Sequence, residues 1–137
     1  MKKHYIYLIM ISILSTSCIR QFHNETKIIE NSKVLETTYY DLNDKTSSLL
    51  CGEAIDIETK EKLAYITVEI KRPLITYSTS GDSSSFFQFK NKIPGTYKVQ
   101  FKYIGYKPLI IDSINIENGK AINVRVGLKS QKIFLIE

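Results

Sequence analysis

Residues 91–109 read NKIPGTYKVQFKYIGYKPL, and this stretch predicts the fold. The turn-forming pair Pro94-Gly95 precedes a segment in which apolar and polar side chains alternate. The apolar members are Tyr97, Val99, Phe101 and Tyr103. Such strict alternation is typical of a β-strand with one buried and one solvated face. At about 3.3 Å per residue the strand is about 23 Å long, enough to cross a small domain. We therefore expect a central strand of a β-sandwich here.

The composition fits one domain with additional segments. The chain has 137 residues, with nine Tyr, six Phe and no Trp, and aromatic and β-branched residues favour strands. The formal net charge is +5; without Lys2 and Lys3, 17 basic residues face 14 acidic ones, which leaves +3. A charge this small and dispersed gives no support for nucleic-acid binding, so we expect no nucleic-acid partner.

The N-terminus has the order of an export signal. Two lysines precede an apolar run at residues 5–14. Ten residues make about 15 Å of helix, half of the roughly 30 Å hydrocarbon core, so a membrane span is the weaker interpretation. The next residues, Leu14-Ser15-Thr16-Ser17-Cys18, resemble the lipobox of bacterial lipoproteins, although Ser15 stands where Leu is usual.

This resemblance implies a signal peptide at residues 1–17 and lipidation of Cys18. An ordinary cleaved signal with a coincidental cysteine is the alternative. Each buried CH₂ is worth about 0.8 kcal/mol, and two acyl chains already anchor a protein stably, so the mature chain would stay on the membrane. Residues 19–23 contain no acidic cluster that would mark surface export. We expect the outer membrane of a Gram-negative envelope, facing the periplasm, with surface exposure as the alternative.

Residues 19–47 show neither the sustained hydrophobic period of a helix nor that of a strand, because short apolar groups are scattered among polar residues. This favours a segment 18–47 that consists of the lipidated cysteine and a tether. The alternative is that residues 33–42 form an edge strand or a short helix docked on the domain.

From residue 49 onwards, short alternating segments recur at the regular spacing of an all-β domain. We expect a seven-stranded Greek-key β-sandwich at residues 48–128, followed by a C-terminal tail at 129–137. The expected strands are 50–55, 64–71, 74–79, 87–90, 97–103, 109–116 and 122–128. Pro73 breaks or borders the second of them, because proline has no N–H for a central ladder.

Five motifs occur in an order that is informative. They are Gly52-Glu53-Ala54-Ile55-Asp56, residues 64–70, Phe87-Gln88-Phe89, Pro94-Gly95-Thr96-Tyr97 and Ile104-Gly105-Tyr106. This order resembles the carboxypeptidase-regulatory-like domain, a transthyretin-related (prealbumin-like) β-sandwich of bacterial envelope proteins, over about residues 49–128. Ser84-Ser85 departs from the Asp-Gly turn of that family, so we expect a different loop there. The resemblance implies a module on its own lipid anchor, without the barrel of TonB-dependent receptors or the catalytic domain of metallocarboxypeptidases.

The expected sandwich contains no histidine, since His4 lies in the signal and His23 in the tether. This argues against Ser-His and Cys-His nucleophiles and against histidine metal sites. We therefore expect no enzyme, no catalytic residue, no metal ion and no cofactor. Cys51 is interpreted as a small core residue, with a redox or interchain disulfide role as the alternative.

Three further groups each have a simple and a functional interpretation. Asp56, Glu58 and Glu61 form a solvated turn or a calcium site, although they lack EF-hand spacing. Lys90, Lys92, Lys98 and Lys102 lie on wet strand faces or form a patch for an acidic polymer or headgroup. Tyr65, Tyr77 and Tyr106 pack against strands or stack on a glycan. The simple interpretation is favoured for each group.

These observations lead to one hypothesis and one alternative. The hypothesis is a non-catalytic, membrane-anchored envelope lipoprotein whose β-sandwich binds or assembles another envelope protein, with a sheet edge offered to a partner strand. The alternative is a glycan- or peptide-binding receptor lipoprotein that uses loop aromatics.

Overall fold

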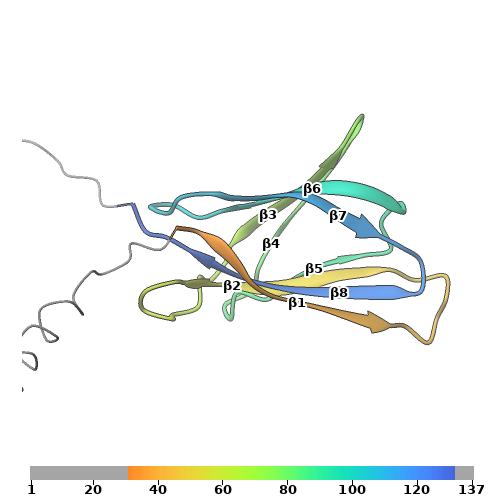
Figure 1. The fold of residues 1–137 in the computed structure, drawn as a ribbon, viewed down its shortest axis with the longest axis horizontal. Coiled ribbons are helices and arrows are strands. Elements are labelled where there is room, and N and C mark those ends of the chain that lie inside the picture. The colour runs from red at the N-terminus through yellow and green to blue at the C-terminus, as the bar shows by residue number, and fades with distance from the viewer. Residues whose placement is uncertain (1–30, 132–137) are drawn as a thin grey trace, which may run out of the picture.

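The structure is a computed structural model that describes residues 31–131. It is an all-β sandwich of two four-stranded sheets (Figure 1). The predicted signal peptide and the lipidation of Cys18 lie outside the described residues, as does the end of the predicted tail. No helix in the described part of the chain is long and apolar enough to cross a membrane.

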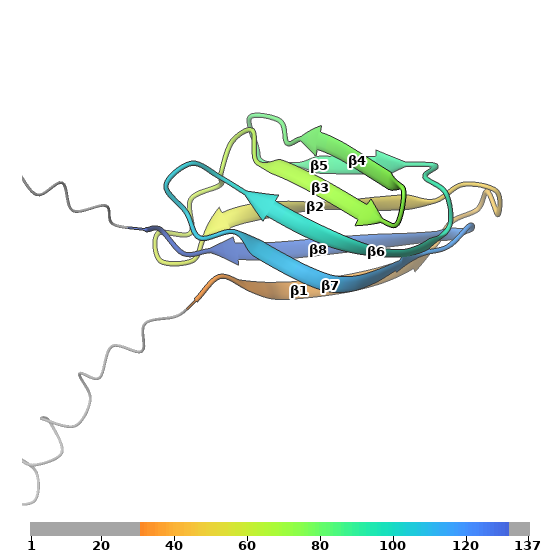
Figure 2. The same ribbon diagram turned by 90° about the horizontal axis from the view of Figure 1, so that it is seen from above.

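One sheet, called the β1 sheet, has the order β1-β8-β2-β5, and the other, the β6 sheet, has the order β4-β3-β6-β7. The strand bounds are β1 (Lys33–Asp41), β2 (Leu49–Asp56), β3 (Thr67–Arg72), β4 (Ile75–Ser80), β5 (Phe87–Lys90), β6 (Gly95–Lys102), β7 (Leu109–Ile116) and β8 (Lys120–Leu128). Neighbouring strands are antiparallel except β2 and β8, which are parallel. Seen from above, β7 lies over β1 and β6 over β8 (Figure 2).

The prediction of a central strand is confirmed, because β6 lies between β3 and β7. Tyr97, Val99 and Phe101 are fully buried, whereas Lys98 and Lys102 are exposed. Alternation along β6 therefore separates the core from solvent as the sequence predicts. From the β1 sheet, the core receives Leu50, Ala54, Phe87, Phe89, Ile122, Val124 and Val126.

The tether prediction is wrong over part of its length, because Lys33–Asp41 forms strand β1 at the edge of a sheet. It pairs antiparallel with β8, from Lys33 opposite Gly127 to Asp41 opposite Lys120. The edge-strand alternative is thus confirmed, and the sandwich has eight strands where seven were expected. The physical reason is burial: every β1 residue is exposed or only half-buried, so the strand needs no alternating apolar face.

Two strands begin later than predicted because turns occupy their first residues. Pro73 and Leu74 form the turn between β3 and β4, and Leu74 has a φ of +68°. Proline followed by a residue with positive φ is the pattern of a type II turn. Tyr65 also has a positive φ, +62°, so β3 starts at Thr67 rather than at residue 64.

The loop before β5 contains a serine in the left-handed conformation. Ser85 has a φ of +69°, a value that glycine adopts without strain in an Asp-Gly turn. The different loop shape expected from Ser84-Ser85 stays a prediction. Ser85 is fully buried, and its Oγ accepts a hydrogen bond of 3.1 Å from the Ala54 N–H. Asp82 Oδ1 accepts bonds from the N–H groups of Ser84 and Phe86. These side-chain bonds offset the cost of a left-handed serine.

Candidate binding groove

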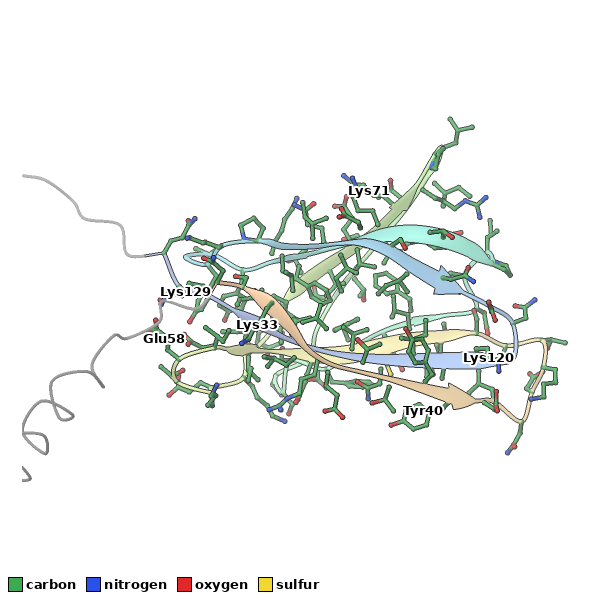
Figure 3. All side chains as sticks on the ribbon, viewed as in Figure 1. Lys33, Tyr40, Glu58, Lys71, Lys120 and Lys129 are labelled. Carbon is green, nitrogen blue, oxygen red and sulfur yellow. The ribbon has the colours of Figure 1, made fainter. Side chains whose placement is uncertain are left out.

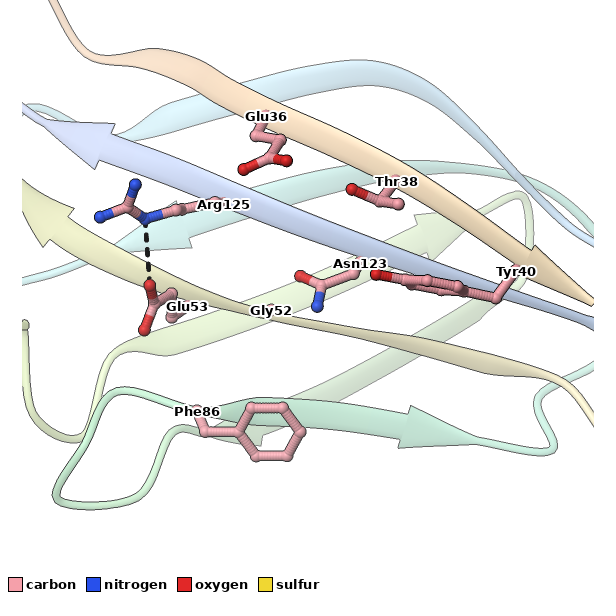
Figure 4. Close-up of a pocket in the computed structure, with 8 residues that line it drawn as sticks. All are labelled: Glu36, Thr38, Tyr40, Gly52, Glu53, Phe86, Asn123 and Arg125. Carbon is pink, nitrogen blue, oxygen red and sulfur yellow. Dashed lines mark hydrogen bonds and ion pairs between the residues drawn. The ribbon is translucent and has the colours of Figure 1, made fainter.

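A shallow groove crosses the outer face of the β1 sheet, on the side away from the core. Its volume is about 310 Å³, at the lower end of the range for small-ligand sites. It is lined by Glu36, Thr38, Tyr40, Gly52, Glu53, Phe86, Asn123 and Arg125 (Figure 4). The lining residues come from β1, β8, β2 and the loop before β5, so the groove spans the full width of the sheet.

The middle of the groove is polar and charged. Arg125 Nε donates to Glu53 Oε1 at 3.0 Å, and Lys62 Nζ lies 3.3 Å from the second oxygen of the same carboxylate. Glu36 is the register partner of Arg125, and Thr38 is that of Asn123. Cross-strand partners have their side chains on the same face. The floor therefore offers a guanidinium, carboxylates, an amide and a hydroxyl to a ligand.

An aromatic side chain lies at each side of the groove. Tyr40 is 52% exposed and Phe86 is 44% exposed. Tyr40 projects from the outer side of β1, and its hydroxyl points toward Asn123 (Figures 3 and 4). Exposed rings beside hydrogen-bonding groups suit a ligand with both apolar surface and polar groups, such as an extended peptide or a sugar.

Among the described residues, no strand pairs with the outer edge of β1, and this free edge borders the groove. The Leu42 N–H donates to the Gly119 carbonyl at 2.8 Å, and in an antiparallel pair the backbone groups of successive residues turn alternately toward and away from the partner strand. In this register, the groups of Thr38 and Tyr40 turn toward β8. The N–H and C=O groups of Thr37 and Tyr39 therefore face the open side.

Gly52 and Cys51 lie in β2 beneath the groove. A Cβ at Gly52 would lie 1.8 Å from the Val124 carbonyl oxygen, so only glycine permits this approach of β2 to β8. Cys51 is 8% exposed, and its register partners are Gln88 and Asn123. It is buried as predicted, but alternation places it on the outer face of the sheet rather than between the sheets. Burial raises the pKa of the Cys51 thiol, which keeps it protonated and unreactive near neutral pH.

The three tyrosines considered as a glycan platform do not form one. Tyr65 and Tyr106 line a hollow at one end of the sandwich, whereas Tyr77 lies on β4, with its ring 6.3 Å from that of Tyr97. Tyr77 and Tyr106 pack against the core, as the simple interpretation predicts. Tyr65 does not, because it is 66% exposed.

The three clustered carboxylates do not behave alike: Asp56 and Glu58 make the contacts described next, whereas Glu61 is exposed. Asp56 is buried: its Oδ1 accepts from the N–H groups of Glu58 and Thr59, and its Oδ2 accepts from the Tyr106 hydroxyl at 2.7 Å. The bond to the Asp56 carboxylate is the main reason why the pKa of Tyr106 rises to about 12. Glu58 forms an ion pair with Lys129 (Figure 3). Asp56 thus holds the turn by capping backbone amides and is not the solvated residue expected.

The four lysines do not share a face. Lys98 and Lys102 are exposed on β6, whereas Lys90 ends β5 in the other sheet. The Lys92 ammonium lies 4.7 Å from the centre of the Tyr77 ring, a cation–π contact. A single basic patch is therefore not formed.

Sequence reasoning missed the residues of the groove. Outward alternation on β8 identifies Asn123 and Arg125 as surface residues, but it does not say which strand lies beside them. Glu53 meets Arg125 across 72 positions of sequence, through the parallel pairing of β2 with β8. This long-range pairing leaves no local signal in the sequence.

Several solved structures resemble the fold. The chain is 12% identical to a protein of Bacteroides uniformis provisionally assigned to carbohydrate binding, with a TM-score of 0.49 over 58% of this chain and 40% of that one. GBS52, the minor pilin of Streptococcus agalactiae, shows 17% identity and a TM-score of 0.48 over 69% and 49%. A hydroxyquinol 1,2-dioxygenase of Pseudomonas putida shows 8% identity and a TM-score of 0.49 over 66% of this chain and 59% of that one.

The chain thus spans from two fifths to three fifths of the length of these structures. At such identities and TM-scores the likeness carries no inference about function. No curated protein matches the chain.

The comparison with protein families agrees with the order of motifs in the sequence. The model of the CarboxypepD_reg-like domain matches residues 50–137, well over half of the chain. The match begins in β2 and includes every later strand. The chain therefore belongs to the CarboxypepD_reg-like domain family.

Proposed function

We propose that this chain is a non-catalytic envelope lipoprotein whose sandwich binds an extended segment of another envelope protein. The observation that carries the proposal is the free edge of β1 beside the groove. A partner strand would bond to the outward backbone groups of Thr37 and Tyr39. Its side chains on the groove side would contact Tyr40, Asn123 and Arg125. Backbone pairing supplies affinity in this mode, and side-chain pockets supply specificity.

Two observations favour β1 among the four edge strands, which are β1, β5, β4 and β7. β1 is the longest of them, with nine residues against eight in β7, six in β4 and four in β5. It also lines the groove, whereas β7 and β4 belong to the other sheet. Proteins usually protect edges with proline, lysine, bulges or short strands. On β1 a register shift between Val34 and Glu36 protects the start, but residues 37–41 read TTYYD, without proline or lysine.

A pair of substitutions at Thr37 tests this mode of binding. Thr37→Pro removes an outward N–H and should abolish capture of the partner from native envelopes, while Thr37→Ala should retain it. Proline is tolerated at edge positions whose N–H faces solvent, so both variants should fold. Equal capture by the two variants would show that the β1 edge is not the binding site.

The anchor is a separate part of the proposal. Cys18 would carry the lipid and hold the domain at the outer membrane, facing the periplasm. Labelling of the wild-type chain with radioactive palmitate, lost in Cys18→Ala, is the expected result. Labelling that persists in Cys18→Ala, or is absent from the wild type, would contradict the anchor.

A second candidate function is glycan binding in the same groove. It is favoured by the exposed rings of Tyr40 and Phe86 on either side of polar Asn123 and Arg125. A glycan would depend on side chains and not on the strand edge. Tyr40→Ala and Asn123→Ala should then reduce binding on a glycan array, whereas Thr37→Pro should leave it unchanged.

A further inference from the structure

A second surface, at one end of the sandwich, is apolar and is not used by the groove. Ile104 is 98% exposed and Tyr65 is 66% exposed. They line a hollow of about 550 Å³ together with Ala64, Thr67, Lys102, Tyr103, Tyr106 and Pro108. We call this surface the apolar tip. Lys102 is the last residue of β6 and Lys107 lies in the loop that follows it; both are exposed and lie within three residues of Ile104 in the sequence.

Backbone bonds hold the tip in shape. The Tyr65 N–H donates to the Asp82 carbonyl at 3.0 Å, and the Tyr106 N–H donates to the Tyr103 carbonyl at 3.0 Å. Gly105 has a φ of +84°, which glycine adopts without strain. A Cβ at this position would meet nothing within 4 Å, so glycine is needed here for the backbone conformation and not for packing. The rings of Tyr103 and Tyr106 lie edge to face, 5.4 Å apart. Ile104 is therefore held out into solvent by an ordered turn.

The described chain begins beside this tip. Ser32 Oγ donates to the Lys107 carbonyl at 3.0 Å and accepts from the Lys129 N–H at 2.8 Å. Both ends of the described chain lie at this end of the sandwich (Figures 1 and 2). Thirteen residues lead from Cys18 to Asn31, and fully extended they span at most about 45 Å. A lipid on Cys18 would therefore attach at the end of the domain that carries the tip.

We infer that the apolar tip docks on the membrane that holds the anchor. Ile104 and Tyr65 enter the boundary between headgroups and acyl chains, and Lys102 and Lys107 contact lipid phosphates. Tyrosine favours this boundary, and lysines beside inserted apolar residues add attraction to anionic lipids. The inference rests on the proposed lipid anchor. It also orients the domain, because β1 then runs from its membrane end at Lys33 toward Asp41, away from the bilayer.

The absence of tryptophan from the chain makes a direct test available. Ile104→Trp places a single reporter on the tip. Leu74→Trp places a matched reporter in the β3–β4 turn at the other end, where Leu74 is likewise fully exposed. The full lipidated chain carrying either substitution is reconstituted in vesicles of phosphatidylethanolamine and phosphatidylglycerol with brominated acyl chains, which quench tryptophan only at short range.

The expected result is an emission shift to shorter wavelength and several-fold stronger bromolipid quenching for Ile104→Trp than for Leu74→Trp. Vesicle-bound protein with equal quenching at both positions overturns tip docking while leaving the anchor intact. A shift that grows with protein concentration without lipid assigns the tip to contact between copies, which also overturns it. Failure of the chain to sediment with vesicles overturns both the anchor and the docking.

Discussion

Strands β6 and β1 are both long and both contain tyrosines, yet they occupy opposite environments. Tyr97 on β6 is 0% exposed, and its hydroxyl donates to the Ile93 carbonyl. Tyr39 on β1 is 71% exposed. β6 has a bonded strand on each side, whereas β1 pairs within the described residues with β8 alone. The difference shows that position in the sheet, more than residue type, decides whether an aromatic strand stabilises the fold or remains available for binding.

The largest expected contrast between the two strands is in stability. Phe101→Ala should lower the free energy of unfolding by about 3–5 kcal/mol, because a fully buried ring leaves a cavity. Tyr39→Ala should change it by no more than about 0.5 kcal/mol, as is usual for exposed positions. Urea unfolding of both variants measures the contrast. Equal losses would mean that β1 is as integral to the core as β6.

The next contrast lies within β1 itself. Thr38→Pro removes an N–H that faces β8 and leaves a carbonyl of β8 without its donor, so it should cost about 1–3 kcal/mol. Thr37→Pro removes an outward N–H and should cost less than about 1 kcal/mol. Urea unfolding, with hydrogen exchange of the β8 amides, compares the pair. Similar costs for both prolines would refute the assigned direction of the backbone groups.

A smaller effect concerns the bond that joins the end of β2 to the loop after β6. Tyr106→Phe removes the bond to the Asp56 carboxylate and should cost about 1–2 kcal/mol near neutral pH. The pKa of Tyr106 is raised to about 12 in the folded chain. Its contribution is therefore present in full below pH 10, the ordinary value, and is lost as the pH rises toward 12. The difference in stability between wild type and Tyr106→Phe should shrink over that interval, as followed by thermal unfolding. If the difference in stability between the two proteins stays constant up to pH 12, the hydrogen bond to Asp56 does not raise the pKa of the Tyr106 hydroxyl.

The smallest effect concerns the turn that follows β1. Hydrogen bonds from the side chains of Thr46 and Ser47, and from the Thr46 N–H, lower the pKa of Asp44 from 3.8 to about 2. Because the pKa of Asp44 is lower in the folded chain, its carboxylate stabilises the fold at pH values above its ordinary pKa. This contribution is lost as the pH falls from about 4 toward 2. Asp44→Asn should therefore flatten the acid side of the stability curve slightly. A curve identical to that of the wild type would mean that this turn does not help to hold β1.

The contrast also explains what the sequence predicts well. Strands with one buried face carry the alternation that burial requires, as Val99 and Phe101 do on β6. Strand β1 has no buried face, so its sequence has no period, and a segment without a period favours a tether when only the sequence is considered. The groove escaped prediction for another reason. Glu53 and Arg125 meet only because β2 lies parallel to β8. Lipidation of Cys18 stays a prediction.

Photo-crosslinking at the β1 edge tests the central claim most directly. A benzophenone amino acid replaces Tyr39 at the open edge or, as the control, Lys98 on the exposed face of β6. In native envelopes, the reporter at Tyr39 should give one crosslinked protein, which Thr37→Pro abolishes and Thr37→Ala retains. The reporter at Lys98 should give none. The same product from both positions, or a product at Tyr39 that survives Thr37→Pro, would contradict binding at the free edge of β1.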